Sequence, residues 1–219
     1  MHIQIESLIA AAIILLVSFP VHEWAHAYAA YRLGDGTAKM FGRLTLNPIA
    51  HFDPIGGSLL ALTFIGSAFT GAPIGFGWAK PTPINPLNLQ NGRSSEALVA
   101  AAGPVSNFVL AALAALPLRF IVANPTLAVP DLLIETLALF VQINLLLMIF
   151  NFIPIPPLDG SKVMFAFLDR RTEYQIRPIL EQYGFIILIA VLFLPPGNSI
   201  GSRVISPILV GLFDLLVGV

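Results

Sequence analysis

The sequence predicts an all-α polytopic membrane protein, with about five to six transmembrane helices and a small β-hairpin or re-entrant element after the first helix. Of its 219 residues, 57% are hydrophobic and 11% are charged, whereas soluble domains average about 45–50% apolar and about 25% charged residues. Hydrophobic segments near the length that crosses a bilayer cover residues 5–31, 96–120, 132–152, 179–194 and 204–217. These apolar segments thus account for nearly half of the chain.

The composition also excludes several function classes. A net charge of -1 gives no electrostatic basis for nucleic acid as a partner. The absence of cysteine excludes disulfides, thiolate metal sites and cysteine nucleophiles. Any metal must therefore be held by nitrogen and oxygen ligands.

Residues 53–78 form a further apolar segment, interrupted by glycines and two prolines, that either crosses the membrane or enters and leaves on one side. If it crosses, the eleven basic residues divide six to five between the two faces; if it re-enters, nine lie on one face and two, Arg119 and Arg203, on the other. Because basic residues accumulate on the cytoplasmic side, the charges favour re-entry. The segments 5–31 and 132–152 then both end near the cytoplasmic face.

Two stretches between the first and second long segments have features of short strands. Residues 37–48 show near-alternation of apolar and polar residues before an Asn-Pro turn. Residues 77–86 carry Pro81, Pro83 and Pro86, which confine any strand there to a sheet edge. Residues 37–46 or 76–84 could offer an edge to an unwound peptide.

The motif "FPVHEWAHAYAAY" at residues 19–31 places His22, Glu23 and His26 at the end of an apolar segment. Positions i and i+4 share one face of a helix, so the two imidazoles can bind one metal ion. Glu23 lies about 100° round the helix from His22 and can reach a water on that metal. This spacing is typical of zinc hydrolases, which need a third protein ligand and one open position.

Asp159, in "NFIPIPPLDG" at residues 151–160, is the candidate third ligand. The prolines end the preceding helix, and irregular backbone at membrane depth is tolerated where it lines a cavity. An ionisable residue beside a membrane segment also indicates function. The alternative is that Asp159 only caps a helix or a turn before Gly160.

These motifs, together with "AAGPVSN" at residues 101–107, resemble those of the site-2 protease family, peptidase family M50, of intramembrane metalloproteases. The resemblance covers roughly residues 5–165. It implies Zn²⁺ held by His22, His26 and Asp159, and Glu23 as the catalytic residue. It further implies cleavage of membrane-spanning substrates near their cytoplasmic ends.

The resemblance also suggests that Asn107 and Asn151 line the site and bind the scissile backbone or its oxyanion. The alternative for both is interhelical hydrogen bonding. The chain resembles small prokaryotic members, because the loop at residues 119–131 is too short for a PDZ domain. We expect one membrane-embedded protease domain over residues 1–219, with a catalytic core at about 5–165 and a C-terminal helical pair at about 179–218.

The expected partners are single-span transmembrane protein substrates and membrane lipid, in a prokaryotic cell membrane with the active site towards the cytoplasm. The alternative function is a metal-binding membrane transporter or non-catalytic scaffold with the same His/His/Asp site. His51 and Asp53 lie close enough in sequence to suggest a second metal site, although an interfacial loop histidine is the simpler interpretation.

Overall fold

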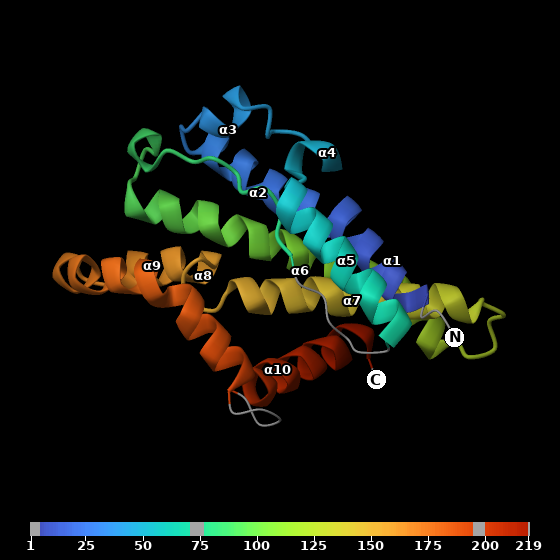
Figure 1. The fold of residues 1–219 in the computed structure, drawn as a ribbon. Coiled ribbons are helices and arrows are strands. Elements are labelled where there is room, and N and C mark those ends of the chain that lie inside the picture. The colour runs from blue at the N-terminus through green and yellow to red at the C-terminus, as the bar shows by residue number, and fades with distance from the viewer. Residues whose placement is uncertain (1–4, 71–76, 195–199, 219) are drawn as a thin grey trace.

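The computed structural model describes residues 5–70, 77–194 and 200–218, and the regular elements within these ranges are helices (Figure 1). Among the described residues, four helices are long and apolar enough to cross a membrane: Leu8–Arg32, Arg93–Ala123, Asp131–Asn151 and Arg170–Leu192. The all-helical membrane architecture is therefore confirmed. The predicted count of five to six spans is not, because α5 (Pro54–Thr70) is a shorter apolar helix and α10 (Ile200–Val217) is not among the four.

The first span is one long helix in three consecutive pieces, α1 (Ile5–Ile13), the π-helical turn η1 (Ile14–Ser18) and α2 (Phe19–Arg32). Pro20 follows η1 at the start of α2 and has no N–H to continue the regular ladder. The N–H of Phe19 bonds the carbonyl of Ile14 in the wider π register. Such π-turns occur often beside functional sites.

The predicted strand and turn at residues 37–48 are not confirmed, because short helices form there instead. These are α3 (Thr37–Met40) and α4 (Pro48–His51). Asn47 caps α4 by accepting a hydrogen bond from the N–H of Ile49, and Pro48 fits the first helical position. The described residues contain no strand, so the expected β-hairpin is absent from them.

The helix α5 (Pro54–Thr70) packs against α1. A side chain on Gly56 would collide with Trp78, and one on Gly77 would collide with Leu60 and the carbonyl of Gly56. Residues 77 and 78 therefore lie beside the first turns of α5. The two ends of the 53–78 segment meet at one end of the helix, as the re-entrant alternative requires.

The central element is α6 (Arg93–Ala123), which packs against α2, α7 (Asp131–Asn151) and α8 (Asp159–Phe167) (Figure 1). The core between α6, α7 and α10 contains small residues on α6 that let the helix axes approach closely. Its buried members are Ala111, Ala115, Leu118, Val141, Leu145 and Val217. Because α6 contacts both α2 and α8, it fixes the position of one relative to the other.

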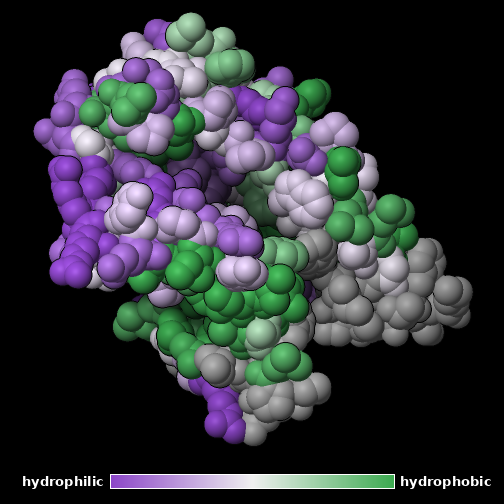
Figure 2. Space-filling view, turned by 60° about the vertical axis from the view of Figure 1, so that its left-hand side comes forward, coloured by the Kyte–Doolittle hydropathy of each residue, from purple (hydrophilic) through white to green (hydrophobic). Residues whose placement is uncertain are grey.

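Ion pairs join the start of α6 to α9 (Arg170–Phe193). Arg177 pairs with Glu96 at 3.3 Å, Glu173 at 3.1 Å and Glu181 at 2.8 Å, and Arg93 pairs with Glu173 at 3.0 Å. Hydrophilic residues gather over the end of the molecule where α6 and α9 begin, and hydrophobic residues over its lower part (Figure 2). This polarity suits a protein with one end at a membrane surface.

A tight turn with three prolines joins α7 to α8. Gly160, the second residue of α8, lies so close to the start of this turn that a side chain there would collide with the carbonyls of Phe152 and Ile153. Arg93 donates to the carbonyls of Phe165 and Leu168 at the other end of α8. The position of α8 is thus fixed at both ends.

We expect Gly160→Ala to destabilise the protein by about 1–3 kcal/mol, because the added methyl group meets rigid backbone rather than a movable side chain. The measurement is thermal unfolding of the purified protein in detergent. Gly211→Ala on α10 is the matched control, since nothing lies within 4 Å of the added carbon. Equal unfolding temperatures for Gly160→Ala and wild type would contradict this packing.

Candidate metal centre

The structure brings His22, His26 and Asp159 together, and each of them is buried. The two histidines project from one face of α2, four residues apart, and Asp159 is the first residue of α8. One carboxylate oxygen, Oδ2 of Asp159, lies 3.2 Å from Nε2 of His22 and 3.1 Å from Nε2 of His26. The two Nε2 atoms are 3.0 Å apart.

This donor set fits zinc in kind and in size. A tetrahedral zinc ion with ligand bonds of about 2.0–2.1 Å separates its ligand atoms by about 3.3–3.4 Å, close to the separations of 3.0–3.2 Å found here. Two imidazole nitrogens and one carboxylate oxygen leave the fourth position open, as in catalytic zinc sites. The three residues could therefore hold a zinc ion with room for a water or a substrate.

Hydrogen bonds fix the tautomer of both histidines. The Nδ1 atom of His26 lies 2.7 Å from the carbonyl oxygen of Val99, which can only accept, so Nδ1 carries the proton. The Nδ1 atom of His22 lies 2.6 Å from Oδ1 of Asn107. Protonation at Nδ1 leaves the lone pair of each Nε2 directed at the metal position.

A chain of buried amides sets the direction of the bond to His22. Asn144 donates to the carbonyl of Phe140 at 2.9 Å, and its own Oδ1 accepts from Asn107 at 3.0 Å. Asn107 therefore presents its oxygen, not its amide nitrogen, to His22. Both asparagines are 0% exposed.

Gly103 closes the cluster on the side of α6. A side chain there would collide with Nε2 of both His22 and His26. Its neighbour Pro104 stays within the continuous helix α6, so the Gly-Pro pair permits close packing without breaking the helix.

The carboxyl of Asp159 remains ionised in this environment. Burial alone would raise its pKa, but imidazoles of His22 and His26 that are protonated at Nε2 would donate to Oδ2, outweigh burial and hold the pKa of Asp159 below its usual range. The second oxygen, Oδ1, lies 3.9 Å from Nζ of Lys162, one turn along α8. Asp159 thus combines a metal-facing oxygen with a second oxygen near a cation.

Glu23 lies beside His22 on α2 and is half-buried. Its Oε2 accepts a hydrogen bond of 2.8 Å from the main-chain N–H of Thr82, and its main-chain oxygen accepts one of 3.1 Å from the Thr82 hydroxyl. Residues 77–85, which carry Thr82, have no regular secondary structure. A segment distant in sequence therefore holds the candidate base.

Asn151 is placed differently from Asn107. It lies at the end of α7, half-buried, and its Nδ2 donates to the carbonyl of Leu147 within the same helix at 2.9 Å. Asn107 instead lies fully buried behind His22.

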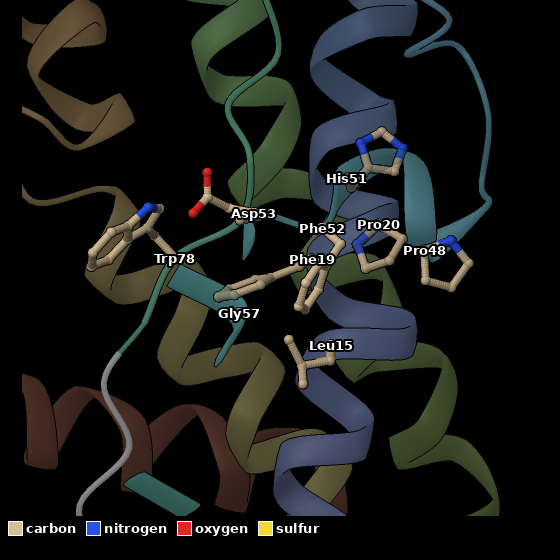
Figure 3. A pocket seen from close by; sticks show the side chains of 10 residues that line it. Leu15, Phe19, Pro20, Pro48, His51, Phe52, Asp53, Gly57 and Trp78 are labelled. Atoms are coloured by element: carbon tan, nitrogen blue, oxygen red, sulfur yellow. The ribbon is translucent and has the colours of Figure 1, made fainter. Parts of the chain in front are cut away.

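The described part of the chain contains no metal-ligand cluster at His51 and Asp53. His51 Nε2 lies 2.7 Å from the carbonyl of Thr45, and Asp53 accepts from the N–H groups of Ile55 and Gly56 at the start of α5. Figure 3 shows both residues at a small cavity of about 10 Å³, with their polar ends apart. His51 instead stabilises the loop before α5 through its hydrogen bond to the carbonyl of Thr45.

Sequence reasoning missed three residues of this site: Asn144, Thr82 and the role of Gly103. Asn144 carried a usable signal, because an amide in an apolar span needs a partner. Thr82 carried none, since its contact with Glu23 depends on how residues 77–85 fold back along α2.

Comparisons with known proteins indicate the family of this chain. Residues 119–194 match the model of peptidase family M50. YwhC of Bacillus subtilis, which carries a zinc metalloprotease name, is 40% identical over 200 residues, which are 90% of this chain and 84% of YwhC. Rip2 of Mycolicibacterium smegmatis, also named as a zinc metalloprotease, is 32% identical over 84% of this chain and 66% of its own length. Rip2 of Mycobacterium tuberculosis strain H37Rv is 31% identical over 83% of this chain and 65% of its own length.

No solved structure matches the chain. The relationship therefore rests on sequence similarity. The structure is consistent with it, because its helices are apolar enough to span a membrane and its buried histidines and aspartate suit zinc. The chain belongs to peptidase family M50 and is a membrane-embedded zinc metalloprotease of the site-2 type.

Proposed function

We propose that this protease hydrolyses peptide bonds of single-span transmembrane proteins near their cytoplasmic ends, with His22, His26 and Asp159 as its zinc ligands and Glu23 as its general base. The observation that carries the proposal is the convergence of these ligands from the end of the first span and the turn after α7. His26 lies six residues before the end of its span, about 9 Å along a helix. A peptide bond cleaved there would lie close to the membrane surface.

The residues of the site divide the chemistry between them. Zinc, when bound, supplies Lewis acidity that polarises a peptide carbonyl and acidifies a water. Glu23 takes a proton from the attacking water and passes it to the leaving amine. Asn107 and the carbonyl of Val99 hold the two imidazoles in the tautomer that leaves Nε2 free.

The amide of Asn107 already bonds His22 and Asn144, so we assign it to orienting His22 rather than to binding substrate. Asn151, half-buried at the end of α7, remains our candidate for contact with the scissile backbone. Asn107 and Asn151, for which the family resemblance suggested the same role, therefore receive different roles.

The distribution of charge supports the cytoplasmic orientation. With a re-entrant 53–78 segment, nine of the eleven basic residues would lie on the face where the first span ends, with Arg119 and Arg203 as the exceptions. Basic residues mark the cytoplasmic side of a bacterial membrane protein and contact its anionic lipid. The proposed location is a prokaryotic plasma membrane.

A transmembrane substrate must be unwound before hydrolysis, because its peptide bonds lie within its own helix. An extended edge on the enzyme can hold the unwound strand. Residues 37–40 are helical and unsuited to this, whereas residues 77–84 are free of helix and contact Glu23 through Thr82. We therefore propose residues 77–84 as the substrate-binding edge.

We expect Glu23→Gln to reduce cleavage by roughly 10²–10⁴-fold, the usual contribution of a general base, while the protein keeps its zinc. Cleavage of single-span proteins in liposomes and zinc content measured on the same samples test both statements. A metal transporter or scaffold needs no base at this position. Unchanged proteolysis in Glu23→Gln would therefore refute the mechanism.

We expect Asn107→Leu to weaken zinc binding by roughly 10–100-fold, the usual loss when a partner that orients a metal-ligating histidine is removed. Competition with a chelator of known affinity measures this loss. Asn151→Leu is the matched control and should keep the zinc affinity, because its amide bonds only its own helix in the structure. Equal zinc affinities for Asn107→Leu and wild type would contradict the role of the amide chain.

A further inference from the structure

The contact between Thr82 and Glu23 joins two parts of the chain 59 residues apart through two hydrogen bonds. The first runs from the main-chain N–H of Thr82 to Oε2 of Glu23, and the second from the Thr82 hydroxyl to the main-chain oxygen of Glu23. Together they bind the side-chain carboxylate and the main-chain carbonyl of Glu23. Contact at the main-chain oxygen also fixes the register of residues 77–85 along α2, beside which the segment runs (Figure 1).

We propose that Thr82 is a positioning residue for catalysis, whose main-chain N–H orients the carboxylate of Glu23. The inference rests on the proposed role of Glu23 as general base. A hydrogen bond to Oε2 restricts a long, flexible side chain and leaves Oε1 available to accept a proton. Such preorganisation lowers the entropic cost of reaching the reactive geometry.

The residues on either side make this donor specific. Pro81 and Pro83 have no N–H, so Thr82 supplies the sole main-chain donor of residues 81–83. Their rings also restrict φ and thereby stiffen the backbone that carries the donor. A rigid backbone group is a more reliable support for a base than a second flexible side chain.

The segment is fixed on both sides of Thr82. Before it, the N–H of Lys80 bonds the carbonyl of His51 at 2.9 Å. After it, the N–H of Asn85 bonds Oδ2 of Asp35 at 2.7 Å. Asp35 is fully buried, accepts further bonds from Thr37 and Asn88, and has a pKa held below its usual range by these hydrogen bonds against the opposing effect of burial. The donor at Thr82 is therefore held in place independently of Glu23.

The test replaces the main-chain N–H of Thr82 by an ester oxygen, using the α-hydroxy acid counterpart of threonine introduced at that codon. This removes the donor and keeps the side chain. We expect kcat to fall roughly 10–100-fold, as a misplaced catalytic group does, with KM changed less than about 3-fold, zinc content retained and the unfolding temperature close to that of the control.

The matched control is the same ester substitution at Thr172 on α9, which also removes a threonine main-chain N–H that bonds a carboxylate, but the non-catalytic one of Asp169. It should lower stability without the loss of kcat. Thr82→Val keeps the main-chain donor and removes only the hydroxyl, so it should lose much less kcat than the Thr82 ester.

Three results would overturn the proposal: an unchanged kcat in the Thr82 ester, an equal fall of kcat in both esters, or a change confined to KM. The last would assign Thr82 to substrate binding alone. Glu23→Gln, measured alongside, separates this inference from the proposed function. If Glu23→Gln is inactive and the Thr82 ester is fully active, Glu23 is the base but Thr82 does not position it.

Discussion

The structure depends on the approach of one carboxylate oxygen of Asp159 to two imidazole nitrogens of α2, from elements more than 130 residues apart in sequence. A buried carboxylate is costly unless it is paired. Here Lys162 lies 3.9 Å from the second carboxylate oxygen, and a zinc ion supplies positive charge at the first when it binds. Much of the surrounding packing serves to bring these atoms within about 3 Å of one another.

Two glycines make that approach sterically feasible. Gly103 lets α6 lie directly against both imidazole rings, and Gly160 lets the start of α8 lie against the backbone that follows α7. A methyl group at either position would separate elements that must touch. Arg93 then binds the far end of α8 through the carbonyls of Phe165 and Leu168, so that Asp159 is held by the whole helix rather than by its own turn.

The sequence predicted the parts of this site that follow from local geometry. The i, i+4 spacing of His22 and His26 requires only a helix, and the prolines before Asp159 require only that a helix end there. The charge distribution also favoured a re-entrant 53–78 segment, and in the structure the two ends of that segment meet at Gly56 and Trp78.

The remainder depended on contacts that a single sequence does not encode locally. The alternation in residues 37–48 suggested a strand, but the Asn47 cap and Pro48 favour a helical turn once Arg43 and His51 bond the carbonyls of that loop. Asn107 and Asn151 looked alike because the family resemblance suggested the same role for both. Only the packing of α6 against α7 distinguishes them, by placing Asn144 beside Asn107.

Metal binding and proton transfer depend on different parts of the chain. The orientation of the His22 imidazole depends on the amides of α6 and α7, through a chain of hydrogen bonds that ends at a carbonyl within α7, and that of His26 depends on the carbonyl of Val99. The carboxylate of Glu23 instead faces residues 77–85, an irregular segment held by Asp35 and by the loop at His51. Because Glu23 and His22 are neighbours on α2, this helix connects the hydrogen bonds that orient the imidazole with those that hold the carboxylate. A change in the 77–85 segment can therefore alter the base while the metal ligands keep their geometry.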